Sequence, residues 1–243
     1  MQLDSDSNRL PVALVSGASS GIGQATARRL AQAGFAVALV ARNRERLAGL
    51  QAELPTATSL TIAQDLTDFA ALGALVEAVE AKLGPIAVLV NNAGMAYTGP
   101  LETMPVADWE QVLKLNLTAP FALTRAVLPT MRQRRTGTII NMVSIAGKQT
   151  FADWGAYCAS KFGLLAFSRT LAQEVRQDGI RVTALCPGAV DTALWDSEAV
   201  TADFDRQAML AAETVADLVL YAASLPERAV LEEVVLMPSG GVL

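Results

Sequence analysis

The sequence predicts a doubly wound α/β fold, in which helices cover both faces of a parallel sheet of about seven strands. Short apolar runs of strand length alternate with amphipathic stretches of helix length along the chain. Glycine or proline ends several of the helical stretches. Strand, helix and strand in this order form right-handed crossovers between parallel strands, which place helices over both faces of the sheet.

The expected strands are short apolar runs. They are Pro11–Ser16, Phe35–Ala41, Thr58–Ala63, Ile86–Val90, Gly137–Val143, Ile180–Leu185 and Val234–Met237. The expected helices lie between them, and Asn43 and Thr67 are candidate capping residues for two of them. The helices run from the glycines at 17–23 to Gly34, from Asn43 to about Glu53, from Thr67 to about Leu83, and over Val106–Leu113, Leu115–Arg134 and Trp154–Asp178.

The chain has 243 residues, which is the size of one large α/β domain. We expect that domain to cover residues 11–243, after a polar N-terminal extension over residues 1–10. The segment from Pro187 to about Met209 has no clear place in the sheet. Because a loop of that length in a compact domain is usually functional, we expect residues 188–210 to form a substrate loop.

The composition argues against several classes of partner. With 52 % hydrophobic and 18 % charged residues, the chain is expected to be a well-buried globular protein. A formal net charge of −5 and the lack of a basic run make nucleic acid a poor partner. No segment has the length of a transmembrane helix or the pattern of a signal peptide. We therefore expect no membrane partner and a cytoplasmic location.

The chain has 2 cysteines and no histidine. Cys158 and Cys186 have neither the spacing of metal ligands nor that of a disulfide framework, so we expect no metal. Without histidine, Ser-His-Asp and Cys-His catalytic systems are excluded. Any general acid or base must be a tyrosine, lysine, aspartate, glutamate or cysteine.

A glycine-rich loop lies between the first expected strand and the first expected helix. Glycines let the backbone approach a pyrophosphate, and a helix N-terminus supplies free N–H groups and the positive end of a dipole. A tight turn that needs glycine is the alternative, but the position between a strand and a helix favours dinucleotide binding. The expected cofactor-binding residues of this loop are Gly17, Ser19, Ser20, Gly21, Ile22 and Gly23.

Two further motifs follow strands at the same edge of the sheet, where ligands of open α/β sheets bind. Asp65 and Leu66 follow the third strand. Asp65 either accepts a hydrogen bond from an adenine amine or caps a helix. Asn92, Ala93 and Gly94 follow the fourth strand, where small residues allow a cofactor to lie close and an amide can tie loops together.

A serine, a tyrosine and a lysine form the candidate catalytic group. Tyr157 and Lys161 are four residues apart on an expected helix, so they share a face, and Ser144 follows the fifth strand. A nearby ammonium favours the phenolate and lowers the pKa of a tyrosine toward the working range. Such a pair can deliver a proton to a carbonyl oxygen that the serine hydroxyl helps to hold. The alternative is an interface tyrosine and a solvated lysine.

In this order, the motifs resemble those of the short-chain dehydrogenase/reductase family in its non-extended form, over nearly the whole chain. The interval of 13 residues between Ser144 and Tyr157 is similar to the family's. The resemblance implies a Rossmann-type fold and a catalytic tetrad of Asn116, Ser144, Tyr157 and Lys161. Tyr157 would donate the proton in reduction. Lys161 would lower the pKa of Tyr157 and bind the nicotinamide ribose, and Asn116 would hold a water that relays protons to Lys161.

The resemblance also implies cofactor contacts after the sixth strand, at Pro187, Gly188, Val190 and Thr192. It implies a homotetramer, or else a dimer, that packs through the two longest helices. The C-terminus departs from the family pattern, because Met237–Gly241 stands where a valine-aspartate-glycine-glycine run is usual.

The residues after the second strand indicate which nicotinamide cofactor binds. An NAD-preferring site usually places a carboxylate there, but Arg42 follows the strand, Arg44 is near, and the first carboxylate is Glu45. A guanidinium suits a 2′-phosphate through charge-assisted hydrogen bonds. We therefore predict NADP(H); the alternative for Arg42 is a solvated arginine on the next helix.

The candidate substrate residues are mostly apolar. Aromatic residues are more often simple core, but those of the substrate loop together with Trp154 suggest an apolar pocket. The candidates are Ile145, Trp154, Leu194 and Trp195, with Phe204 on the same loop.

The leading hypothesis is an NADPH-dependent ketone reductase or alcohol dehydrogenase, similar to carbonyl reductases and 3-oxoacyl-[acyl-carrier-protein] reductases. A reductase specific for 3-oxoacyl thioesters is the first alternative, and a non-catalytic NADP-binding regulatory protein is the second. No arginine pair clearly marks a docking face for an acyl carrier protein. The candidates for such a face are Arg125, Arg132, Arg134 and Arg169.

Overall fold

The computed structural model describes residues 10–54, 59–201 and 205–241, so nearly all of the expected N-terminal extension and Phe204 lie outside the described residues. The strands are β1 (Val12–Ser16), β2 (Ala36–Ala41), β3 (Ser59–Ala63), β4 (Ile86–Asn91), β5 (Gly137–Met142), β6 (Ile180–Pro187) and β7 (Glu233–Leu236). They form a single seven-stranded sheet in the order β3-β2-β1-β4-β5-β6-β7, and each neighbouring pair is parallel. The expected doubly wound, Rossmann-type sheet is therefore confirmed.

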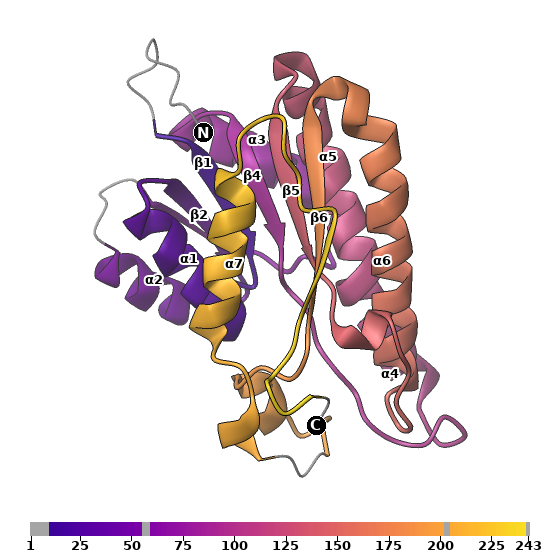
Figure 1. The fold of residues 1–243 in the computed structure, drawn as a ribbon. Helices are drawn as coiled ribbons and strands as arrows, with labels where there is room; N and C mark the ends of the chain where they lie inside the picture. Colours follow the sequence, from indigo (N-terminus) through magenta and orange to yellow (C-terminus); the bar gives the residue numbers. More distant parts are fainter. Residues whose placement is uncertain (1–9, 55–58, 202–204, 242–243) are drawn as a thin grey trace.

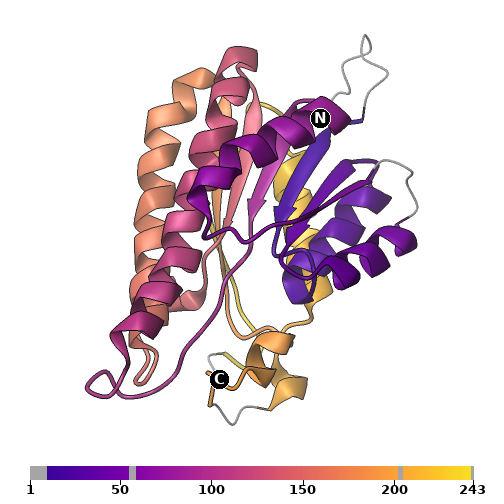
Figure 2. The same ribbon diagram turned by 180° about the vertical axis from the view of Figure 1, so that it is seen from behind.

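Helices cover both faces of this sheet (Figures 1 and 2). The helices are α1 (Gly21–Gln32), α2 (Arg44–Glu53), α3 (Leu72–Leu83), α4 (Val106–Leu113), α5 (Ala119–Arg134), α6 (Gly155–Val175) and α7 (Ala212–Ser224). Apolar side chains of α1, α2 and α7 join the core on one face, and those of α3, α5 and α6 join the core on the other.

The strand β1 illustrates why the buried strands read as continuous apolar runs. All five of its residues are buried. Ala13 and Val15 belong to one core, whereas Val12 and Leu14 belong to the other. Because helices cover both faces of the sheet, neither set of side chains contacts water, and alternation with polar residues is lost.

The helix α7 was not expected from the sequence. Its N-cap residue is Ala211, whose side chain cannot cap the helix, so no capping residue marks the start of the helix in the sequence. Its buried positions nevertheless follow helical spacing, and many of them are alanines that let it lie close to α1 (Figure 1). The spacing that would have revealed the helix is that of Ala212, Val215, Ala216, Val219, Ala222 and Ala223.

Two helix boundaries differ from the expectation. Thr67 does not cap α3, which begins at Leu72 after a 3₁₀ turn over Phe69–Ala71. The Thr67 hydroxyl instead donates to the Asp65 carboxylate at 2.8 Å. The expected junction between α4 and α5 is a π-helical turn over Lys114–Thr118, which carries Asn116.

The strand order reverses between β1 and β4, which is the position where open α/β sheets bind ligands beyond the carboxyl ends of their strands. Loops after β1 to β6 all border this region, and they include most of the residues singled out from the sequence. In the part of the chain that the structure describes, no helix is long and apolar enough to cross a membrane.

Candidate active site

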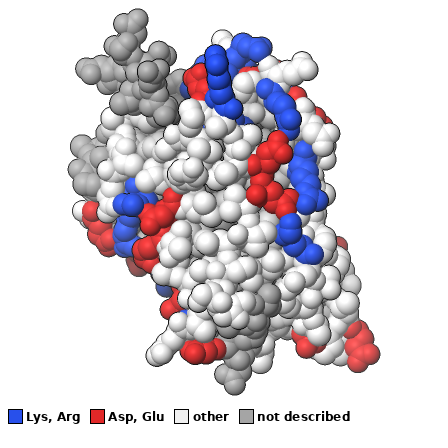
Figure 3. Space-filling model, in the orientation of Figure 1, with Lys and Arg blue, Asp and Glu red and all other residues white. Residues whose placement is uncertain are grey.

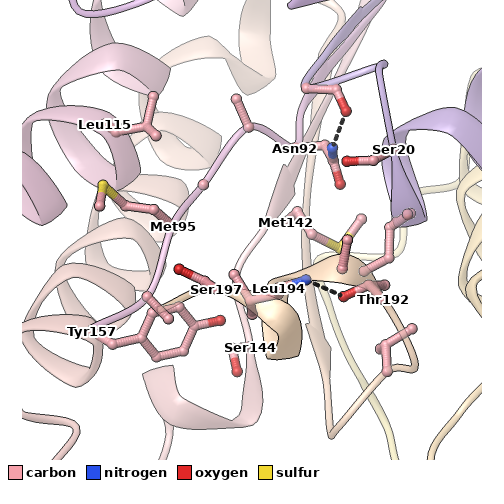
Figure 4. A pocket seen from close by; sticks show the side chains of 18 of the residues that line it. Ser20, Asn92, Met95, Leu115, Met142, Ser144, Tyr157, Thr192, Leu194 and Ser197 are labelled. Atoms are coloured by element: carbon pink, nitrogen blue, oxygen red, sulfur yellow. Dashed lines mark hydrogen bonds between the residues drawn. The ribbon is translucent and has the colours of Figure 1, made fainter. Parts of the chain in front are cut away.

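A cavity of about 960 Å³ lies at the carboxyl ends of the strands. Tyr157, Met95 and Leu115 lie on one side of it, and Ser20, Asn92 and Thr192 lie on the other (Figure 4). Nearly every candidate residue from the sequence lines it; these are Gly17, Ser19, Ser20, Gly21, Ile22, Arg42, Asp65, Leu66, Asn92, Ala93, Gly94, Ser144, Ile145, Trp154, Tyr157, Lys161, Pro187, Gly188, Val190, Thr192, Leu194 and Trp195.

Gly23 and Asn116 are the two candidates that do not line the cavity. Gly23 lies directly behind its wall, where a Cβ atom would be 2.2 Å from the carbonyl oxygen of Gly17. Gly17 has a φ of +68°, and a Cβ atom there would be 2.8 Å from the Cα of Ala93. Both positions therefore need glycine, one for close packing and the other for its backbone conformation as well.

The N-terminus of α1 opens onto the cavity. Ser20 occupies the capping position, but its side chain makes no capping hydrogen bond, and no acidic residue lies in the first turn. The first N–H groups of the helix therefore remain available to an anion, and the helix dipole favours one. This backbone arrangement fits the pyrophosphate of a dinucleotide.

Hydrogen bonds from one buried serine lock the loop after β1 to the loop after β4. The Ser16 hydroxyl donates to the carbonyl of Val90 at 3.1 Å and accepts from the backbone N–H groups of Asn92 and Ala93 at 2.9 and 3.1 Å. The Asn92 amide donates back to the Ser16 carbonyl at 3.0 Å. Sequence reasoning identified Asn92 as a possible tie but missed Ser16.

Tyr157 and Lys161 lie one turn apart on α6 and share the face toward the cavity. The Lys161 Nζ is buried, donates to the carbonyl of Met142 at 2.8 Å, and lies 5.6 Å from the centroid of the Tyr157 ring. The Ser144 hydroxyl accepts from the N–H of Ala146 at 3.1 Å, which leaves its own hydrogen to donate. The phenol of Tyr157, the ammonium of Lys161 and the hydroxyl of Ser144 therefore all lie at this end of the cavity.

The pKa values of this pair are set mainly by burial. Burial raises the pKa of Tyr157, although a hydrogen bond with Ser144 acts in the opposite direction. Burial also lowers the pKa of Lys161 to about 8. Burial is the largest influence on Tyr157, so its pKa lies above the usual value, and the lowering by Lys161 stays a prediction.

Asn116 acts on the backbone rather than on the cavity. Its fully buried amide accepts from the N–H of Met95 at 2.9 Å and donates to the carbonyl of Met95 at 2.8 Å and to the Ser160 hydroxyl at 3.1 Å. The Ser160 hydroxyl donates in turn to the carbonyl of Tyr157 at 2.7 Å. The side chain thus joins the loop after β4 to the turn of α6 that carries the tyrosine.

The loops after β2 and β3 form the other end of the cavity. Arg42 lines it and is exposed, and Arg46, from the first turn of α2, lines it as well. Asn43 caps α2 by accepting from the N–H of Arg46 at 2.9 Å, as the sequence predicts. Sequence reasoning did not include Arg46 among the cofactor-binding residues, although it follows Arg42 by four residues, a spacing that can bring two side chains to the same side of the chain.

Asp65 also lies at this end, but its carboxylate is engaged within its own loop. It accepts from the N–H of Thr67 at 2.9 Å and from the Thr67 hydroxyl. These two bonds, with smaller contributions from Arg42 and Lys114, hold the pKa of Asp65 below its usual value. The alternative that Asp65 caps a regular helix is wrong, because the bonds close a local turn ahead of the 3₁₀ segment.

Aromatic side chains dominate the end that holds Tyr157. The Trp154 ring packs edge-on against Tyr157 at 5.5 Å and against Trp195 at 5.8 Å between centroids. Further lining residues that sequence reasoning missed are Met95, Phe151, Ala193 and Ser197. No spacing signal identifies them, because they lie on loops that approach one another only in the folded chain.

The substrate loop is held by one arginine. The Arg206 guanidinium donates to Asp191 at 2.5 Å, to Asp196 at 2.9 Å and to the carbonyl of Thr192 at 3.1 Å. These contacts close the part of the loop that carries Leu194 and Trp195. No group of three potential metal ligands is found within residues 10–54, 59–201 and 205–241.

Comparisons with known proteins agree with this arrangement. The family model of the short chain dehydrogenases matches residues 11–202. The chain therefore belongs to the short-chain dehydrogenase/reductase family, an oxidoreductase family that binds nicotinamide cofactors.

Three individual proteins illustrate the similarity. An acetoacetyl-CoA reductase from Paracoccus denitrificans is 39 % identical over 183 residues, which cover 75 % of each chain. A metagenomic short-chain oxidoreductase crystallised with NADP is 37 % identical, with a TM-score of 0.83 and coverage of 94 % of this chain and 97 % of the other. A variant of actinorhodin polyketide ketoreductase crystallised with NADPH is 34 % identical, with a TM-score of 0.86 and coverage of 94 % and 95 %. Both structures hold the cofactor expected from the sequence.

Proposed function

We propose that this protein is an NADPH-dependent reductase of ketones, or in reverse a dehydrogenase of secondary alcohols, with Tyr157 as the proton donor. The observation that carries the proposal is the juxtaposition of Tyr157 and Lys161 at one end of a cavity whose middle opens onto the N-terminus of α1. Bound there, the cofactor supplies or accepts the hydride.

The residues at the catalytic end have separate tasks in this proposal. Tyr157 gives its phenolic proton to the carbonyl oxygen as that oxygen gains charge. Ser144 donates a hydrogen bond to the same oxygen and orients it, because its hydroxyl hydrogen is not used by the protein backbone. Lys161 provides positive charge beside the phenol and binds the ribose next to the nicotinamide, while Asn116 keeps the tyrosine and the loop after β4 in register.

We assign the preference for NADP(H) over NAD(H) to Arg42 and Arg46. Two guanidinium groups beside the loop after β2 suit a 2′-phosphate, whereas the residue directly after that strand is Arg42 and not a carboxylate that would bind an unmodified ribose. The Asp65 carboxylate is held by Thr67 and leaves one oxygen for the adenine amine. The remaining proposed cofactor contacts come from the glycine loop, from 92–94 and from 187–192.

A reductase of 3-oxoacyl thioesters is the second candidate, and the similarity to an acetoacetyl-CoA reductase supports it. The arginines that could dock an acidic carrier protein are mostly engaged elsewhere. Arg132 binds Asp178, and Arg169 and Lys148 both bind Glu233. Figure 3 shows positive and negative side chains next to one another in the region of α6. Arg134 donates to the carbonyl of Ile86. These pairings favour a free ketone or a coenzyme A ester over a carrier-bound substrate.

A regulatory protein without turnover is a weaker candidate. A cofactor sensor needs the glycine loop and the arginines, but it has no use for a buried lysine one turn from a tyrosine that faces the same cavity. Burying an ammonium has a desolvation cost, and such a cost is typical of functional positions.

The proposal is tested by following NADPH consumption with acetoacetyl-CoA, a 3-oxoacyl carrier-protein mimic, aryl ketones, aldehydes and a keto sugar, with NADH in parallel. We expect turnover of simple ketones with NADPH preferred. Turnover confined to the thioesters would establish the second candidate. Tight NADPH binding without turnover on any compound would favour the regulatory candidate.

We also infer a homotetramer, or else a dimer, that packs through α5 and α6. Phe121 on α5 and Phe162 on α6 are 48 % and 41 % exposed, which is unusual for large aromatic rings on neighbouring helices. Both cysteines are free and buried, in agreement with the proposed cytoplasmic location. Light scattering after size-exclusion chromatography measures the assembly, and a monomer at micromolar concentration would contradict it.

A further inference from the structure

The charged residues that line the cavity are unevenly distributed. Within the described part of the chain, they are Arg42, Arg46, Asp65 and Lys161. The first three follow β2 and β3, which lie at one edge of the sheet, whereas the catalytic tyrosine follows β5. Lys161 is therefore the one charged side chain among these at the catalytic end, and its Nζ already donates to the Met142 carbonyl.

The walls around Tyr157 are apolar and come from three separate loops. Trp154 and Phe151 precede α6, Leu194 and Trp195 belong to the substrate loop, and Met95 follows β4. Their side chains are only partly buried in the protein alone. A bound apolar group would remove more of this surface from water, which is favourable by about 25 cal/mol for each Å².

Trp154 is the central member of these walls. Its ring contacts the catalytic Tyr157 on one side and Trp195 of the substrate loop on the other, at centroid distances of 5.5 and 5.8 Å. Because Trp154 lines the cavity next to Tyr157, a group attached to the reacting carbon is expected to contact this ring when the carbonyl oxygen is at the Tyr157 hydroxyl. The shape and polarity of the Trp154 side chain therefore influence which substituents can be accommodated on the reacting carbon.

We propose that Trp154 is a specificity-determining residue that selects ketones with an uncharged, apolar substituent, such as an aryl ring, on the reacting carbon. This inference rests on the proposed function and goes beyond it by naming the substrate class. Such a ring packs against Trp154 edge-on or offset, the geometries that aromatic pairs prefer.

Among the described residues that line this end, an anionic substituent finds no cation other than Lys161, whose Nζ is bound to the Met142 carbonyl. The arginine of the substrate loop, Arg206, is engaged by Asp191 and Asp196 and by the carbonyl of Thr192. Arg42 and Arg46 lie at the far end, where the adenosine part of the cofactor is proposed to bind. A carboxylate beside Trp154 would lose its hydration without gaining a counter-ion, and this loss is costly.

The test compares methyl 4-acetylbenzoate with 4-acetylbenzoate, because the two share the same reacting acetyl group and differ mainly in charge. We expect kcat/KM of the wild-type enzyme with NADPH to be about 100-fold higher for the ester. Leu194→Lys, which places a cation on the wall formed by the substrate loop, should reduce the ester-to-carboxylate ratio of kcat/KM about tenfold.

The role of Trp154 itself is tested by two substitutions. Trp154→Leu should raise KM for the ester about tenfold with a smaller change in kcat, and Trp154→Phe should restore most of the loss. The matched control is Trp109→Phe on α4, a tryptophan outside the cavity lining, which should leave both constants unchanged.

The outcomes separate the two proposals. Equal or better turnover of the carboxylate would overturn the substrate class while leaving the ketone reductase intact. A fall in kcat alone, equal for the ester, the carboxylate and a small aliphatic ketone, would show that Trp154 only positions Tyr157. No NADPH oxidation with either acetyl compound or with any other ketone would overturn the proposed function and this inference together.

Discussion

The two ends of the cavity are built in different ways. The cofactor end is made mostly of backbone, because Gly17 and Gly23 bring loops into contact and the Ser16 hydroxyl joins the loops after β1 and β4. The substrate end is made of side chains on loops that are tied by a few polar contacts. Thr98 makes two of them: its N–H donates to the Ala199 carbonyl at 2.9 Å, and its hydroxyl accepts from the N–H of Thr201 at 2.6 Å.

This difference explains how one framework serves varied substrates. A pyrophosphate is recognised by backbone N–H groups, which every residue type except proline supplies, so the glycines that shape the backbone are the main constraint. A substrate is recognised by the side chains themselves, so exchanging a few of them on the loops changes the wall without disturbing the sheet. The predictions below test this contrast, beginning with the largest effect.

Gly23→Ala should damage the backbone-built end most. The new Cβ atom would lie 2.2 Å from the Gly17 carbonyl oxygen and 2.4 Å from the amide of Asn92. Overpacking of this kind lowers the free energy of unfolding by about 1–3 kcal/mol, and the shifted loop should weaken NADPH binding as well. Chemical denaturation and cofactor titration measure the two effects.

Gly49→Ala is the matched control for that substitution. Gly49 is exposed within α2, and a Cβ atom there meets nothing within 4 Å. Replacing glycine by alanine inside a helix should stabilise the protein by about 0.5–1 kcal/mol without changing NADPH affinity. If both variants behaved alike, the close packing at Gly23 would not be what constrains the loop.

Arg42→Asp should reverse the cofactor preference. Removing charge-assisted hydrogen bonds and adding a repelling carboxylate should weaken NADPH binding about 100-fold while sparing or improving NADH. The ratio of kcat/KM for NADPH to that for NADH reports the change. An unaltered ratio would show that Arg42 does not bind the 2′-phosphate, and Arg46→Asp would then be the next variant to test.

The pH dependence should follow Lys161. Its pKa is lowered to about 8, so its charge is present below that pH and is lost as the pH rises through it, while the raised pKa of Tyr157 keeps the phenol protonated throughout. We expect kcat/KM for NADPH, which reports ionisation in the cofactor-free protein, to be level below about pH 7 and to fall about tenfold per unit above about pH 8. A profile that stays level to about pH 10 would contradict this assignment.

Arg206→Gln should have the smallest effect and should act mainly on the substrate end. The guanidinium is exposed, and solvated ion pairs contribute little, so we expect KM for the ketone to rise only about threefold. NADPH affinity should change less than KM for the ketone, because the bond from Arg206 to the Thr192 carbonyl is the one contact described here that joins it to a proposed cofactor-binding residue. An equal loss of cofactor affinity would mean that the two ends are coupled more closely than their construction suggests.

The same contrast decides what could be predicted from the sequence. The sheet, Asn43 as a helix cap, the glycine loop and the spacing of Tyr157 and Lys161 were all predictable, because each rests on local periodicity or on a fixed interval. Met95 and Phe151 were not, because they meet only when distant loops close around the cavity. The helix α7 was missed although its spacing is regular, because no capping residue marks its start.

The balance between burial and charge at the proposed catalytic pair, Tyr157 and Lys161, could not be predicted from the sequence. The interval between Tyr157 and Lys161 implies proximity, but the bond from Lys161 to the Met142 carbonyl and the burial of Lys161 depend on the packing of α6 against β6. The direction of the pKa shift of Tyr157 follows from that packing.

The most direct test of the central claim is the turnover of Tyr157→Phe, which keeps the ring against Trp154 and removes only the hydroxyl. Ketone reduction with NADPH should fall about 1000-fold, because general acid catalysis contributes effects of this size. The melting temperature and NADPH affinity should stay close to those of the wild type. A folded variant that binds NADPH and retains near wild-type turnover would show that Tyr157 is not the proton donor.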